Sequence, residues 1–182
     1  MVNSRLVKWA AASLEEKKSA LDDGLEQLSR LTIIIPSCCR QDCLLRQAVY
    51  WGYSRARVII VDGSLEPLSA QIRDLISHLP NLTYLHIVDT YVNRLKEACQ
   101  YIKTPYAMAL ADDDFFLMTG LCRAIESLDR NNNLVACMGQ AMAVDYKRDN
   151  GGGYFYPYGG SLWRYQVTHA NALERLHFGI DN

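Results

Sequence analysis

Short apolar runs alternate with longer amphipathic stretches along most of the chain. Four apolar runs have the length of β-strands and end at a proline or an aspartate; they cover residues 31–35, 57–61, 82–88 and 106–111. Apolar residues recur at helical spacing at about 42–52, 67–79, 92–103 and 118–130. Strands that alternate with helices predict βαβ units, and strands that are apolar on both faces predict a sheet covered on both sides. We therefore expect an α/β fold, a single Rossmann-like domain over residues 31–182 with a mostly parallel central sheet flanked by helices.

The two ends of the chain depart from this pattern. Residues 1–30 are expected to form an N-terminal helical extension, because residues 4–29 place apolar side chains at helical spacing between charges. The ordinary role of such an amphipathic segment is to pack on its own domain, and the alternative is a peripheral membrane or oligomer contact. Further strands are expected at 134–138 and 141–146. Residues 151–160, with five glycines and four aromatic residues, are expected to form a mobile loop.

Composition limits the class of protein. A chain of 182 residues, 49% of them hydrophobic and 21% charged, has the composition of a globular protein and not of a disordered one. Nineteen basic and 20 acidic residues give a net charge of −1, which argues against a nucleic-acid partner. No apolar run reaches the roughly 18–20 residues of a membrane span, and charges at positions 15–18 interrupt any signal-peptide core. We expect a cytoplasmic protein, with the inner membrane face as the place of any peripheral contact.

The cysteine pattern favours free thiols. Six cysteines lie at positions 38, 39, 43, 99, 122 and 137, and no secretory signal precedes them. The first three are clustered, but a structural zinc site needs a second ligand pair downstream, which the sequence lacks. The last three have apolar neighbours and are interpreted as small core residues.

Acidic residues follow the predicted strands. Asp62 and Asp89 end the second and third runs, and Asp112, Asp113 and Asp114 end the fourth. Ligands of open α/β sheets bind beyond the carboxyl ends of the strands. Adjacent carboxylates repel one another, and a divalent cation such as Mg²⁺ or Mn²⁺, which bridges carboxylates to phosphates, removes that repulsion. In extended backbone Asp112 and Asp114 point to the same side, which favours a metal site; the alternative is a solvated turn or a helix cap.

Three segments together resemble the nucleotide-sugar-binding half of GT-A glycosyltransferases, specifically family 2. They are LTIIIPSCCR at 31–40, VIIVDGS at 58–64 and MALADDDFF at 108–116. This family typically has a first strand that ends in Pro-Thr/Ser-x-x-Arg, a second that ends in Asp-Asp-Gly-Ser, and a later DxD-type acidic motif. The resemblance covers about residues 30–130. It implies a GT-A nucleotide-sugar-binding domain over 31–182 whose acceptor part is short or incomplete.

The resemblance also implies roles for the matching residues. A nucleotide-diphosphate sugar, most simply of the UDP type, would contact Pro36, Ser37, Arg40, Asp62, Asn93, Arg94, Asp112 and Asp113. Asp62 would accept a hydrogen bond from the base. Mn²⁺ or Mg²⁺ would bind Asp112 and Asp114, although which two of the three acids hold ribose and metal stays open. Only one aspartate precedes Gly63, and two cysteines replace the usual Tyr-Asn after the first strand, departures that bear on base selectivity.

The expected function is metal-dependent, inverting transfer of a sugar from this donor to a hydroxyl of a glycan, lipid or protein. The catalytic base is unassigned, with Asp145 and Glu174 as candidates that carry no motif. One alternative is a non-catalytic or truncated nucleotide-sugar-binding module, which the short C-terminal region and the abrupt end at Asn182 favour. Another is a sugar nucleotidyltransferase, which usually has a glycine-rich phosphate loop after the first strand, where this chain reads PSCCRQD.

Overall fold

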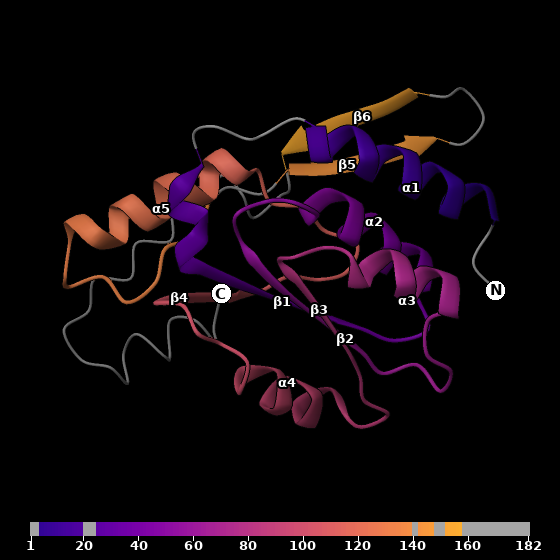
Figure 1. The fold of residues 1–182 in the computed structure, drawn as a ribbon. Coiled ribbons are helices and arrows are strands. Elements are labelled where there is room, and N and C mark those ends of the chain that lie inside the picture. Colours follow the sequence, from indigo (N-terminus) through magenta and orange to yellow (C-terminus); the bar gives the residue numbers. More distant parts are fainter. Residues whose placement is uncertain (1–3, 20–24, 140–141, 148–151, 158–182) are drawn as a thin grey trace. The chain divides into compact units, whose positions relative to one another are not determined.

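A computed structural model describes residues 4–19, 25–139, 142–147 and 152–157 of the chain. The chain divides into two compact units, Met1–Asn132 and Asn133–Asn182. The first unit is built on a four-stranded parallel sheet of strand order β3-β2-β1-β4 (Figure 1). The strands are β1 (Leu31–Ser37), β2 (Arg57–Asp62), β3 (Leu82–His86) and β4 (Tyr106–Ala109). The predicted α/β fold with a parallel sheet flanked by helices is confirmed.

Among the described residues, the helices that accompany the sheet are α1 (Ser4–Ser19), α2 (Gln41–Trp51), α3 (Ala70–Ser77), α4 (Tyr91–Cys99) and α5 (Met118–Arg130), with a 3₁₀ helix, η1 (Glu26–Arg30), before β1. Two of them begin at a side-chain cap. Ser69 Oγ accepts a hydrogen bond from the Ile72 amide, and Thr90 Oγ1 accepts one from the Asn93 amide. Such caps satisfy amide groups that the first helical turn leaves without a partner.

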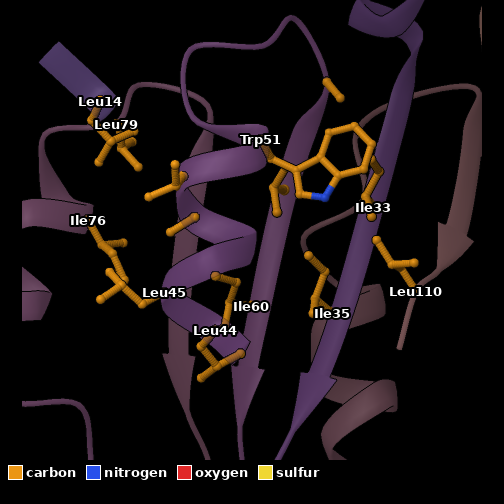
Figure 2. Packing of buried hydrophobic residues seen from close by; sticks show 14 of the residues in the cluster. Leu14, Ile33, Ile35, Leu44, Leu45, Trp51, Ile60, Ile76, Leu79 and Leu110 are labelled. Carbon is orange, nitrogen blue, oxygen red and sulfur yellow. The ribbon is translucent and has the colours of Figure 1, made fainter. Parts of the chain in front are cut away.

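Alternation along the strands divides the core between the two faces of the sheet. Ile33 and Ile35 of β1 face the larger cluster, which includes buried residues of α2 and α3 and the fully buried Trp51 (Figure 2). Ile34, one position out of phase, belongs to a smaller cluster with Ala98 of α4 on the opposite face. Figure 1 shows α2 and α3 on one side of the sheet and α4 on the other.

The amphipathic face of α1 packs inside the first unit. Val7, Ala10 and Leu14 are buried in the larger cluster, and α1 contacts α2. Trp9, on the same helix, is 45% exposed. The apolar stripe predicted from the sequence is therefore part of the core. Within the described residues, no helix is both long and apolar enough to cross a membrane.

A surface cluster joins η1, β4 and α5. The Arg30 guanidinium donates to both carboxylate oxygens of Asp129, at 2.5 and 2.8 Å, and the Tyr106 hydroxyl donates to Asp129 Oδ1 at 2.6 Å. The guanidinium also lies 5.2 Å from the centre of the Tyr106 ring. Hydrogen bonds from Arg30, and then from Tyr106, lower the pKa of Asp129 to about 2.

In the second unit, β5 (Met142–Lys147) pairs antiparallel with β6 (Gly152–Pro157). The strand expected at 141–146 is confirmed, and the loop expected at 151–160 is wrong over 152–157. Aromatic residues favour strands, and a paired partner satisfies the backbone there. The strand expected at 134–138 is also wrong, since these residues are irregular. Apolar composition alone does not make a strand where no ladder satisfies the backbone.

Candidate functional site

The sheet reverses its strand order beside β1. The chain moves outward from β1 through β2 to β3, and α4 then crosses the other face to place β4 on the free side of β1. The β1/β4 boundary is therefore a topological switch point, where open α/β sheets bind ligands. A cavity of about 300 Å³ lies there, lined by Pro36, Arg40, Tyr91, Ala109, Leu110, Ala111, Asp112 and Asp113. Its volume is at the lower end of the range for ligand pockets, roughly 300–1,000 Å³.

The three consecutive aspartates form a turn after β4. The Asp114 amide donates to the Ala111 carbonyl at 3.2 Å, which closes the turn. The chain bends here, so the same-side placement of Asp112 and Asp114 that extended backbone would give does not apply, and the turn that the sequence left open as the alternative is present. Asp112 and Asp113 line the cavity, and Asp114 is outside the set of lining residues. The assignment of Asp114 as a metal ligand stays a prediction.

Arg40, just before α2, brings the two lining carboxylates together. Its Nη1 lies 3.0 Å from Asp112 Oδ1 and its Nη2 lies 2.8 Å from Asp113 Oδ2. The Asp112 side chain is 5% exposed, whereas those of Asp113 and Arg40 are about half exposed. The Arg40 hydrogen bond lowers the pKa of Asp113, and the same bond raises the pKa of Arg40. Two acids and one base form a cluster with one excess negative charge.

Ser37, at the end of β1, completes the surroundings of Asp112. Its hydroxyl donates to Asp112 Oδ2 at 2.5 Å. One oxygen of this buried carboxylate therefore accepts a hydrogen bond from Ser37, and the other is in an ion pair with Arg40. The structure thus brings together four residues that the sequence predicted for a ligand site: Ser37, Arg40, Asp112 and Asp113.

Sequence reasoning missed the residue that holds the acidic turn in place. Gln47 of α2 is fully buried, and its Nε2 donates to the backbone carbonyls of Asp112 and Asp114 at 3.1 and 2.7 Å. Its Oε1 accepts from the Trp51 indole at 3.0 Å. One signal was available: Gln47 lies between Leu44 and Trp51 on the apolar face of a predicted helix. A polar side chain at such a position needs buried partners.

Arg94 of α4 supports the ends of β1 and β2. It is 6% exposed, and its Nη1 donates to the Ser37 carbonyl and, at 3.4 Å, to the Val61 carbonyl. Its Nε is buried without a hydrogen-bond partner. Gly63 packs directly against this guanidinium, since a Cβ added at Gly63 would lie 2.5 Å from Arg94 Cζ. The missing side chain at position 63 makes room for Arg94.

Asp62 is engaged entirely within the protein. It is fully buried, and its Oδ1 accepts from the amide and the hydroxyl of Ser64 at 2.9 and 2.5 Å. Its Oδ2 accepts from the Tyr84 hydroxyl at 2.8 Å. Burial, and then the hydrogen bond to Asp62, raises the pKa of Tyr84. In this arrangement Asp62 orders the turn after β2, and its contact with a nucleotide base stays a prediction.

Asn93, Asp145 and Glu174 complete the set of predicted site residues. Asn93 donates to Asp89 Oδ1 at 2.9 Å in the first turn of α4, and this bond lowers the pKa of Asp89. Asp145 is on β5 of the second unit, and Glu174 lies outside the described residues. In the part of the chain that the structure describes, no three His, Cys, Asp or Glu side chains gather in a metal-binding arrangement. The metal site therefore also stays a prediction.

Each of the six cysteines is a thiol and none is in a disulfide, as expected. Cys122 is buried, but Cys99 and Cys137 are exposed, so their interpretation as core residues is wrong. Apolar neighbours in sequence did not identify the buried face at these two positions. Cys38 and Cys39 are exposed beside the cluster, directly after Ser37.

No protein-family model matches the chain, and a search of curated proteins found no significant match.

Proposed function

We propose that the chain binds a nucleotide-diphosphate sugar at the β1/β4 boundary and transfers its sugar to an acceptor hydroxyl. The proposal rests mainly on one observation: Arg40 lies between Asp112 and Asp113 on the wall of a cavity at the switch point. A guanidinium and carboxylates at the carboxyl ends of parallel strands suit an anionic ligand that is accompanied by a cation. The likeness of three segments to family 2 GT-A enzymes supports the same ligand class.

The donor set suits Mn²⁺ or Mg²⁺. Asp112 and Asp113 both line the cavity, and Asp114 is the third candidate ligand. These ions commonly bind one or two carboxylates together with substrate phosphates, so two protein ligands are sufficient. When bound, such an ion would offset the negative charge that grows on the departing nucleotide diphosphate.

Arg40 is the protein's own phosphate ligand in this proposal. A planar guanidinium that pairs with two carboxylates also matches two phosphate oxygens, because both partners accept a fork of parallel N–H donors. The side chain is 47% exposed, so a ligand in the cavity can reach it. Ser37 and Gln47 act on the acidic turn: one holds the Asp112 carboxylate and the other its backbone.

Tyr91 supplies an apolar surface at the same cavity. It is the first residue of α4, it is 53% exposed, and it lines the cavity with Pro36 and Ala109. An exposed aromatic ring offers a flat face to a sugar or a base. The catalytic base for inverting transfer is unassigned in this proposal, with Asp145 and Glu174 as the candidates from the sequence.

A binding module without turnover is the second candidate function. The observation that favours it is that both acids on the cavity wall are already paired with Arg40. A general base needs a free carboxylate within reach of the acceptor hydroxyl.

Calorimetry with UDP and Mn²⁺ tests the binding, and a donor-hydrolysis assay tests the turnover. We expect the wild type to bind UDP only with Mn²⁺. The Asp112→Asn/Asp113→Asn variant should bind at least about tenfold more weakly, a loss of about 1.4 kcal/mol. Asp74→Asn, which changes an exposed acid on α3, is the matched control. Binding without donor hydrolysis would favour the module, and equal binding by the wild type and the double variant would overturn the site.

A further inference from the structure

Two adjacent thiols lie close together at the end of β1. Cys38 and Cys39 are both exposed, and their sulfur atoms are 3.8 Å apart. Cys39 has a φ of 58°, in the left-handed region that residues other than glycine seldom adopt. Its amide donates to Ser64 Oγ at 2.8 Å, so the turn after β2 holds this backbone conformation. The fold therefore brings the two sulfurs together without a bond between them.

We propose that Cys38 and Cys39 are a redox-active vicinal dithiol, a modification site that closes reversibly to a disulfide between adjacent residues. The oxidant is a peroxide. One thiol loses its proton, and the thiolate attacks a peroxide oxygen and becomes a sulfenic acid; the hydroxide that leaves takes up that proton and becomes water. The second thiol then loses its proton, and its thiolate attacks the sulfenic acid sulfur and expels hydroxide, which takes up this second proton and becomes water. In sum, two thiols lose two protons and two electrons, and hydrogen peroxide becomes two water molecules.

The site favours a disulfide that is easily reduced again. Adjacent Cα atoms are about 3.8 Å apart, closer than the roughly 4.4–6.8 Å of ordinary disulfides, so the small ring is strained. Strained and exposed disulfides are the labile ones, which glutathione reduces, whereas structural disulfides resist it. Both thiols are also accessible to a small oxidant.

The reduced form has its own hydrogen bonds, which oxidation removes. The Cys38 thiol lies 3.4 Å from the Gly63 carbonyl and donates to it. The hydrogen bond with Cys39 raises the pKa of Cys38, a shift in the direction that favours the proton on this thiol in the reduced pair. Forming the disulfide takes that proton away, and the Gly63 carbonyl loses this donor. Oxidation therefore changes the hydrogen bonding of the turn after β2 as well as the thiols at the end of β1.

Trypsin places this pair and Cys43, the nearest other cysteine in the sequence, in different peptides. Cleavage after Arg30 and Arg40 releases a peptide that contains Cys38 and Cys39, while Cys43 is in the following peptide. The reduced protein is treated with stoichiometric hydrogen peroxide, alkylated and digested. We expect the peptide of residues 31–40 to be lighter by two hydrogens than its fully reduced form and to carry no alkyl group. After peroxide treatment, two of the six thiols should no longer react with the alkylating reagent, and treatment with glutathione should restore their reactivity.

Cysteine variants test whether the disulfide joins Cys38 and Cys39. Cys38→Ser and Cys39→Ser should each abolish the lighter peptide, and Cys99→Ser, which changes an exposed thiol at the end of α4, should keep it. Circular dichroism checks that each variant is folded. The proposal is overturned if oxidation joins this peptide to the one that contains Cys43, if it produces only disulfide-linked dimers, or if both thiols remain fully alkylated after peroxide treatment.

Discussion

The side-chain amide of Gln47 donates to the backbone carbonyl of Asp114 at 2.7 Å, and so ties α2 to the acidic turn after β4. The same nitrogen reaches the Asp112 carbonyl at 3.1 Å. Gln47 also accepts from the Trp51 indole, and both side chains are fully buried. One side chain therefore satisfies two backbone carbonyls and one indole N–H, and it holds the acidic turn in place.

Replacing Gln47 by leucine should destabilise the protein and weaken the site. The change leaves two carbonyls and the indole N–H without this partner, and an unsatisfied buried group costs about 1–3 kcal/mol. We expect the free energy of unfolding to fall by at least about 2 kcal/mol in urea denaturation, and the affinity for UDP with Mn²⁺ to fall with it. Gln71→Leu, at an exposed position of α3, is the control. Equal stability of the two variants would contradict this role for Gln47.

Replacing Arg40 by methionine should raise the pKa of Asp113. The Arg40 hydrogen bond is the main cause of its lowered pKa, so without it the pKa should return toward the ordinary value of 3.8. A carboxyl carbon NMR titration measures this shift directly. Arg40→Lys keeps the charge but not the fork of two donors, and should give a smaller shift. An unchanged pKa in Arg40→Met would show that the pair with Asp113 does not persist in solution.

The pair of Asp129 with Arg30 should make stability depend on acid pH. The pKa of Asp129 is lowered from 3.8 to about 2 in the folded protein. Its stabilising contribution is therefore present above pH 3.8 and is lost as the pH falls through 2. We expect Asp129→Asn to be less stable than the wild type at pH 6, and the difference to shrink between pH 4 and pH 2. Urea denaturation at several pH values measures this; a difference that does not vary with pH would count against the charge pair.

Two glycine substitutions should have opposite effects. At position 63 an added Cβ meets the buried Arg94 guanidinium at 2.5 Å, and such overpacking costs about 1–3 kcal/mol. In α5, a Cβ added at Gly120 would lie 3.9 Å from the Leu117 Cβ, an ordinary van der Waals contact, so Gly120→Ala should stabilise the helix by up to about 1 kcal/mol. Thermal unfolding of both variants tests this. A Gly63→Ala protein as stable as the wild type would mean that Arg94 moves aside freely.

Much of the fold could be predicted because local patterns and packing agree. Apolar runs with prolines or aspartates at their ends identified all four parallel strands, and helical spacing identified α2 to α5. The predictions failed where contacts between residues far apart in the sequence determine the local backbone structure. The bend at Asp112–Asp114 depends on Gln47, which is more than sixty residues away, and the strand pairing of 152–157 depends on β5. The pairing of Arg40 with Asp113 likewise required the fold.

The two faces of the sheet differ in the number of buried apolar residues that pack against them. The larger cluster unites α1, α2, α3 and α5 with the sheet, whereas the smaller one holds four buried residues, with Ala98 as the contribution of α4. A layer with few buried apolar contacts opens at lower free energy than the whole domain. The amides of α4 should therefore exchange with solvent deuterium by a partial opening, ahead of those of β1 and β2. The helix α4 carries Tyr91, which lines the cavity, and Arg94, which donates to the Ser37 carbonyl at the end of β1. Each such opening therefore also removes one wall of the cavity, and a bound ligand should slow exchange along this helix.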